Sequence, residues 1–166
     1  MQQIAGMQLF LVCEGKLLLI LRDDKPDIRI DPVNGIHFPN CWALMGGGVE
    51  EGENFFQTAA REVKEELGIE FQLQILGVSP KGNCYFFAEI DRELADQIIL
   101  GEGQDFRFFY PQELDRLNLG GAIQIYLGKY RKVVEKMISS GKPAKGSHLG
   151  LFIWNGGRSN WHEGET

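Results

Sequence analysis

Three glutamates that lie close together in the sequence, Glu62, Glu65 and Glu66, could bind a metal ion. On a helical wheel they fall within an arc of roughly 100°. Their position is unfavourable for folding, because they occupy the last turns of a predicted helix, where the helix dipole favours cations. Glu62 and Glu66 also form a like-charge i,i+4 pair, which destabilises an isolated helix by roughly 0.2–0.5 kcal/mol. A divalent cation such as Mg²⁺, which prefers oxygen ligands, would explain the cluster; the alternative is a solvated acidic surface.

A glycine-rich loop, Gly46-Gly47-Gly48, precedes this helix and would let the backbone approach a ligand or metal closely. Together, loop and helix form the pattern Gly47-x5-Glu53-x7-Arg61-Glu62-Val63-x-Glu65-Glu66-x-Gly68-Ile69. At every defined position this pattern resembles the sequence box of the Nudix hydrolase family. The chain is similar to the bacterial MutT-like hydrolases of nucleoside diphosphate derivatives, over about residues 8–140.

The resemblance implies a role for each residue of the box. The carbonyl oxygen of Gly47 and the three glutamates are implied as metal ligands, and the metal as Mg²⁺, with Mn²⁺ as a substitute. Glu53 and Arg61 are implied to brace the loop against the helix, although Arg61 could instead contact a phosphate. The implied catalytic group consists of Glu53, Arg61, Glu62 and Glu65. The candidate substrate-binding residues outside the box are Arg22 and Trp42.

A fourth carboxylate is expected from a loop after the box, because three glutamates on one helix cover only one side of a cation that needs octahedral coordination. The candidates are Glu102 and Asp105, in a segment whose glycines, Gly101 and Gly103, would allow a close approach. We predict Glu102, because its segment resembles the family and because its side chain is longer. The alternative is that both residues are ordinary solvated acids.

The implied reaction is metal-dependent hydrolysis of a diphosphate (pyrophosphate) linkage in a nucleotide or nucleoside diphosphate-linked substrate. Metal ions neutralise phosphate oxygens and lower the pKa of bound water, and one glutamate acts as the base or orients the water. Three alternatives stay open. A non-catalytic Nudix-fold module that binds a nucleotide or diphosphate would usually have an eroded box. A diphosphate isomerase would need extra catalytic groups, such as a placed cysteine, but Cys41 and Cys84 lie in no recognisable motif. A calcium-binding structural protein would have alternating acidic residues in a loop.

Composition restricts the partners and the compartment. The 166 residues suit a single domain, and the net charge of −6 argues against general nucleic-acid binding. No apolar run approaches the ~20 residues of a membrane span, and the N-terminus lacks a signal-peptide pattern. The odd number of cysteines, without metal-ligand spacing, is typical of a reducing compartment. We therefore expect a cytoplasmic protein without a membrane partner that binds a small nucleotide or diphosphate substrate, with a homodimer as an option.

The glutamates require a helix over residues 54–67, which Asn54 and Gln57 would cap at its start and Gly68 would end. Its predicted buried stripe consists of Phe56, Ala59, Ala60, Val63 and Leu67. A hairpin is expected over residues 8–13 and 16–21, and further strands over residues 42–45, 69–76, 83–90 and 106–110.

Helices are expected at residues 111–114 and 122–138, residues 91–100 are ambiguous, and residues 22–41 should form a long loop. Strands with segregated helices indicate an α+β or a layered α/β/α domain. The resemblance implies a Nudix-type α/β/α sandwich, of the α+β class, around a mixed β-sheet in one domain. We expect this domain over residues 1–141, followed by a C-terminal tail of uncertain order at residues 142–166.

Overall fold

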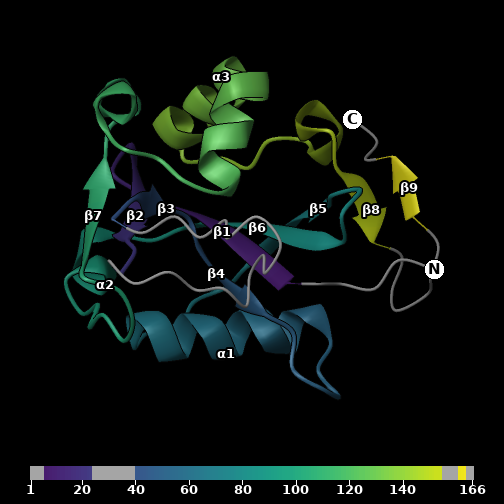
Figure 1. The fold of residues 1–166 in the computed structure, drawn as a ribbon, viewed down its shortest axis with the longest axis horizontal. Helices are drawn as coiled ribbons and strands as arrows, with labels where there is room; N and C mark the ends of the chain where they lie inside the picture. Colours follow the sequence, from purple (N-terminus) through teal and green to yellow (C-terminus); the bar gives the residue numbers. More distant parts are fainter. Residues whose placement is uncertain (1–5, 24–39, 155–160, 164–166) are drawn as a thin grey trace.

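A β-sheet lies between two long helices that cover its opposite faces (Figure 1). The computed structural model describes residues 6–23, 40–154 and 161–163. Helix α1 (Phe55–Leu67) covers one face and helix α3 (Ala122–Ser140) covers the other. The short helix α2 (Arg92–Ala95) and the 3-10 helices η1 (Pro111–Arg116) and η2 (Gly146–Leu149) lie in the connections. The predicted α/β/α sandwich is confirmed.

The sheet is mixed, as predicted. Among the described residues its strands are β1 (Gly6–Cys13), β2 (Lys16–Leu21), β3 (Trp42–Ala43), β4 (Met45–Gly48), β5 (Gln74–Val78), β6 (Asn83–Glu89), β7 (Asp105–Phe109), β8 (Phe152–Trp154) and β9 (Trp161–Glu163). Their order is β3-β2-β1-β6-β5-β8-β9, with β4 beside β1 and β7 beside β2. β1 and β6 run parallel, and the other strand pairings of the described residues are antiparallel.

Two hydrophobic cores fill the spaces between the sheet and the helices. Leu9 and Leu11 of β1 belong to the core beneath α1, whereas Phe10 and Val12 belong to the core beneath α3. This alternation is what a strand produces, because its successive side chains point to opposite faces. Strand β1 is therefore buried on both faces and lies at the centre of the fold.

The predicted hairpin is confirmed. Glu14 and Gly15 join β1 to β2 with φ angles of 52° and 74°, two successive left-handed values as in the type I′ turn of two-residue hairpins. Most of the loop predicted after it, residues 24–39, lies outside the described residues. The single strand predicted at residues 42–45 is instead two strands. β3 pairs with β2 and β4 pairs with β1, so the chain changes partner at Leu44.

Two further element predictions need correction. The strand predicted at residues 69–76 begins only at Gln74. Ile69, Phe71 and Leu73 still pack against the core beneath α1, but they lie outside any strand. The ambiguous residues 91–100 contain α2, which begins where the Asp91 side chain accepts a hydrogen bond from the backbone of Leu94. The predicted strands β6 and β7 and helix α3 are confirmed with small shifts of their ends.

The segment after Gly141 contributes to the fold. β8 pairs with β5 through Phe152 and Val78, and Leu149 and Leu151 are buried in the core beneath α3. Of the expected tail, residues 142–154 and 161–163 are described. The division of the chain at residue 141 stays a prediction. None of the helices in the described ranges has the length and hydrophobicity that a membrane crossing needs.

Candidate active site

Helix α1 carries the glutamates and is capped at both ends as predicted. The Asn54 side chain accepts a hydrogen bond from the Gln57 backbone at 2.8 Å, and the Gln57 side chain accepts one from the Asn54 backbone at 2.9 Å. Gly68 ends the helix at a φ of 69° and donates its N–H to the carbonyl of Lys64. These caps fix where the helix that carries the glutamates begins and ends.

The buried face of α1 differs from the predicted stripe and includes Glu66. Phe55 and Thr58 are buried, whereas Phe56 and Ala60 are exposed. The helix is therefore rotated toward Phe55, and Glu66, only 8% exposed, lies within its buried face. The wheel could not distinguish these rotations, because Phe55 and Phe56 are adjacent and equally apolar.

Gly47 lies in β4, directly against the carboxyl group of Glu62. Antiparallel pairing with β1 fixes its position, with Met7 opposite Gly47 and Gln8 opposite Gly46. A Cβ atom on Gly47 would overlap the Glu62 carboxylate, so only glycine allows this approach. The structure thus brings together two of the predicted metal ligands.

Arg61 and Glu53 join the loop that follows β4 to helix α1. Arg61 Nε donates to Glu53 Oε2 at 2.7 Å and Arg61 Nη2 donates to Glu53 Oε1 at 2.9 Å. Nη2 also donates to the Gly48 carbonyl at 2.9 Å, while Glu53 accepts from the Glu50 backbone and the Thr58 hydroxyl. The hydrogen bonds from Arg61 lower the pKa of Glu53 to about 2. The pair has the bracing geometry that we predicted.

Arg61 also contacts two of the predicted metal ligands. Its Nη1 atom donates to Glu62 Oε1 at 2.9 Å and to Glu65 Oε2 at 3.2 Å. Burial nevertheless raises the pKa of Glu62. Among the described residues, no three Asp, Glu, His or Cys side chains converge closely enough to hold a metal ion. Metal binding by Glu62 and Glu65 would therefore require both side chains to turn away from Arg61.

The carboxylate of Glu66 is the least favourable group of the site. Within the described ranges it has neither a hydrogen bond nor an ion pair. Burial, followed by the negative charges of Glu62 and Glu102, raises its pKa to about 8. The positive charge of Arg22 reduces this rise. A buried ionised group without a partner is costly. The donor set of carboxylates and a backbone carbonyl is therefore one that a hard divalent cation would satisfy.

The loop that follows α2 brings Glu102 to the glutamates of α1. The backbone N–H of Gly101 donates to the Glu66 carbonyl at 2.8 Å, and a Cβ atom on Gly101 would overlap the Glu65 carbonyl. The charge of Glu102 raises the pKa of both Glu62 and Glu66. Asp105 begins β7 instead, and its carboxylate accepts hydrogen bonds from the Phe106 backbone and from Arg107.

The family model of the NUDIX domain matches residues 7–126 of the chain. The chain belongs to the NUDIX family. Over 43 residues it is 53% identical to the nucleoside triphosphatase NudI of Escherichia coli, a match that covers 26% of this chain. This match spans only 29% of the length of NudI.

Two solved structures share the fold of this NUDIX domain. A mutT/nudix family protein from Listeria innocua aligns with a TM-score of 0.58 at 21% identity, over 82% of this chain and 96% of that chain. The NUDIX domain of Shewanella oneidensis NrtR, complexed with ADP ribose, aligns with a TM-score of 0.57 at 16% identity, over 80% of this chain and 88% of that chain. At these identities, the likeness shows the fold alone.

The two predicted substrate-binding residues of the NUDIX domain lie in different surroundings. Arg22 follows β2, and its positive charge acts on Glu66, which places it near the glutamates. Trp42 packs edge-on against Phe109, with ring centroids 5.0 Å apart, at the core beneath α3. Arg22 therefore has an electrostatic influence on Glu66, whereas the ring of Trp42 packs at the core beneath α3.

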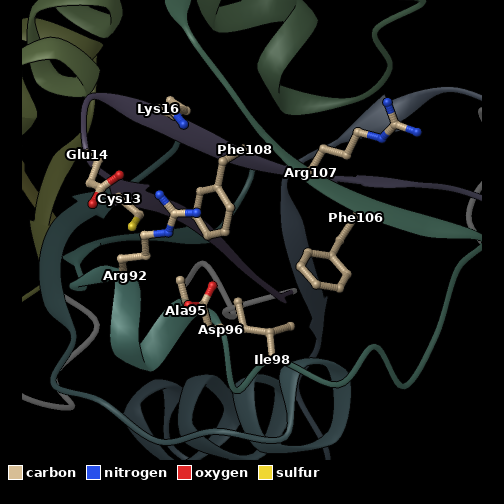
Figure 2. A pocket seen from close by; sticks show the side chains of 10 residues that line it. All are labelled: Cys13, Glu14, Lys16, Arg92, Ala95, Asp96, Ile98, Phe106, Arg107 and Phe108. Carbon is tan, nitrogen blue, oxygen red and sulfur yellow. The ribbon is translucent and has the colours of Figure 1, made fainter.

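A cavity of about 500 Å³ lies elsewhere in the NUDIX domain, between the β1–β2 turn, α2 and β7 (Figure 2). The rings of Phe106 and Phe108 line it, together with Lys16 at the start of β2 and Arg92 of α2. Arg22 follows the opposite end of β2. No predicted site residue is among the described residues that line this cavity, so it is separate from the glutamate cluster.

Sequence reasoning missed two groups of the site. Thr58, which is fully buried, donates to Glu53 from within the buried face of α1, where the predicted stripe had no polar residue. Gln104 donates hydrogen bonds to Arg22 and Asn40, distant in sequence. A contact over 82 residues leaves no local pattern in the sequence, although Gln104 closes the segment on which the prediction of Glu102 rested.

Proposed function

We propose that this NUDIX protein is a metal-dependent hydrolase that cleaves a diphosphate linkage in a nucleoside triphosphate or another nucleoside diphosphate derivative. The observation that carries the proposal is the buried carboxylate of Glu66, beside Glu62 and Glu102 and without a partner among the described residues. The relatives support the substrate class, since NudI is named a nucleoside triphosphatase and the NrtR domain was solved with ADP ribose.

Each carboxylate of the site has a distinct part in this proposal. The groups that would hold Mg²⁺, or Mn²⁺ in its place, are the Gly47 carbonyl and the side chains of Glu62, Glu65, Glu66 and Glu102. When bound, the cation neutralises phosphate oxygens and lowers the pKa of a water molecule. Glu53, with a pKa of about 2, is a poor proton acceptor near neutral pH, so its role is to orient Arg61. Glu62 and Glu65 are left as the candidates for the base or for orienting the water.

Arg22 is proposed to bind a phosphate of the substrate. Its positive charge reduces the rise in the pKa of Glu66. A guanidinium group also matches phosphate oxygens in charge and geometry. The ring of Trp42 packs against Phe109, so only its exposed part could contact a substrate. The assignment of Trp42 to substrate binding stays a prediction.

The test is a panel of nucleoside triphosphates and ADP-ribose, incubated with the protein and Mg²⁺. Cleavage of a triphosphate within its phosphate chain releases either diphosphate and a nucleoside monophosphate, or phosphate and a nucleoside diphosphate. Cleavage of ADP-ribose at its diphosphate releases AMP and ribose 5-phosphate. Binding of panel compounds without any product would contradict the proposal and would instead support the non-catalytic NUDIX binding module.

A further inference from the structure

The side-chain amide of Gln104 connects three segments that are distant in sequence. Nε2 of Gln104 donates to the carbonyl of Arg22 at 2.6 Å and to Oδ1 of Asn40 at 2.8 Å. An amide NH₂ group has two protons, so both of its donors are used. The backbone N–H of Gln104 also donates to the carbonyl of Leu21 at 2.8 Å. A single residue therefore binds the end of β2 and the residue two positions before β3.

Asn40 forms the other half of this connection. Its backbone N–H donates to the Asp23 carbonyl at 3.2 Å, and its carbonyl accepts from the Asn118 side chain at 3.3 Å. Its φ of 56° lies in the left-handed region, which asparagine tolerates better than most residues. The Arg22 backbone also donates to the Cys41 carbonyl at 2.8 Å. Asn40 is thus held in place by its own contacts and offers Gln104 a fixed acceptor.

Glu102 lies between two anchored positions of its loop. On one side, Gly101 is bound through its backbone to the carbonyl of Glu66 in α1. On the other side, a Cβ atom on Gly103 would lie 2.8 Å from Ile20 and 2.9 Å from the Leu21 carbonyl, so the loop is pressed against β2. Within the described part of the chain, Gln104 is the one anchor of residues 101–104 that acts through a side chain. It can therefore be removed by substitution without changing the backbone contacts at Gly101.

We propose that Gln104 is a positioning residue that holds Glu102 and Arg22 in the mutual arrangement that the hydrolytic site requires. This inference rests on the proposed function, in which Glu102 is a metal ligand and Arg22 binds phosphate. Gln104 donates to the backbone of Arg22 and to Asn40, and it acts on the site only through the segments that it joins. Removing its two donors should therefore weaken metal binding through Glu102 without deleting a ligand.

The experiment measures binding of Mn²⁺ alone to the full chain by isothermal titration calorimetry. Gln104→Met keeps the approximate length of the side chain and removes both donors. Gln112→Met is the matched control, because Gln112 is exposed in η1. We expect Gln104→Met to weaken Mn²⁺ binding by about tenfold, the lower end of the range for residues that support metal ligands, and Gln112→Met to bind like the wild type.

A double variant tests whether Gln104 acts through Glu102. If it does, Glu102→Gln combined with Gln104→Met binds Mn²⁺ no more weakly than Glu102→Gln alone, because the two changes remove the same contribution. Additive losses would overturn the inference and leave Glu102 as a ligand. Wild-type affinity in Glu102→Gln would overturn both the assignment of Glu102 and the inference that depends on it.

The affinities of the single variants Gln104→Met and Asn40→Gly also test the role of Gln104. Wild-type affinity in Gln104→Met, together with weakened binding in Glu102→Gln, would show that Gln104 does not position the site, while the proposed function stands. If Gln104→Met fails to fold, Asn40→Gly removes one acceptor and suits the left-handed backbone at that position. This variant should weaken Mn²⁺ binding in the same direction by a smaller factor, and unchanged affinity would contradict the inference.

Discussion

Both carboxylate oxygens of Glu53 accept hydrogen bonds from the guanidinium of Arg61, at 2.7 and 2.9 Å. The same guanidinium also binds the Gly48 carbonyl, Glu62 and Glu65. One planar cation therefore holds the glycine loop, the start of α1 and two predicted metal ligands in a common arrangement. Such a fork of fixed donors is a property of arginine that lysine lacks.

Arg61→Lys should therefore lower turnover by about a hundredfold, the size of loss expected when catalytic groups are misplaced by ~1 Å. Steady-state kinetics on the best substrate of the panel provide the measurement. The matched control is Arg131→Lys, which changes an exposed arginine of α3 that pairs with Asp115. Near-normal turnover in Arg61→Lys would show that charge alone, and not the fork geometry, is needed at this position.

Gly47→Ala should disrupt the site locally, because the added methyl group would overlap the Glu62 carboxylate. We expect at least a tenfold weaker Mn²⁺ affinity, in line with the loss of a group that orients a metal ligand. Gly128→Ala in α3 is the matched control, since its methyl group meets no atom within 4 Å. The control should be more stable than the wild type by about 0.5–1 kcal/mol, as alanine is in helices. Equal Mn²⁺ affinities of both variants would remove the proposed reason for glycine at position 47.

The metal-free protein should lose stability as the pH rises from about 4.5 to about 8. The pKa of Glu66 is raised from its ordinary 4.5 to about 8, so in this range the folded protein keeps a proton that the unfolded chain releases. One such group changes the free energy of unfolding by at most about 1.4 kcal/mol per pH unit. Glu53, with a pKa of about 2, affects the stability only at lower pH, because its stabilising contribution is lost as the pH falls from about 4.5 to about 2.

Urea unfolding in chelator at pH 5 and pH 8 measures this effect, with Glu66→Gln as the control that should flatten the pH dependence. Added Mg²⁺ should raise the unfolding temperature more at pH 8 than at pH 5, because at pH 5 a proton competes for the carboxylate. An equal rise at both pH values would indicate that the cation does not bind at Glu66.

Glu102→Gln and Asp105→Asn separate the two candidates for the fourth carboxylate. Glu102 acts on the pKa of Glu62 and Glu66, whereas Asp105 is bound to Arg107. We therefore expect Glu102→Gln to require at least tenfold more Mg²⁺ for half-maximal turnover, and Asp105→Asn to behave like the wild type. The reverse pattern would assign the role to Asp105, and two normal variants would exclude this loop as a source of metal ligands.

The sequence predicted those features of the site that depend on local spacing. Residues from Gly47 to Gly68 lie in one continuous stretch, so their spacing was enough to predict the capped helix and its glutamates. The partnership of Glu53 with Arg61 was instead implied by the resemblance to the Nudix box. The rotation of α1 was not predictable in this way. It depends on how the whole helix packs against the sheet, where Phe86 of β6 contacts both Phe55 and Phe56 although only Phe55 is buried, and such contacts join segments that are distant in sequence. The burial of Glu66 follows from that rotation.

The most direct test of the central claim is the turnover of wild type and Glu66→Gln on a nucleoside triphosphate, in Mg²⁺ and in excess chelator. The account predicts hydrolysis by the wild type in Mg²⁺ alone and a loss of about a hundredfold or more in Glu66→Gln, as for other groups that stabilise charge in a transition state. At pH 8, where Glu66 is partly ionised, the metal-free variant should unfold at the same or a higher temperature, because it lacks the Glu62–Glu66 repulsion. Robust wild-type hydrolysis in chelator, or near-normal turnover by Glu66→Gln, would contradict the account.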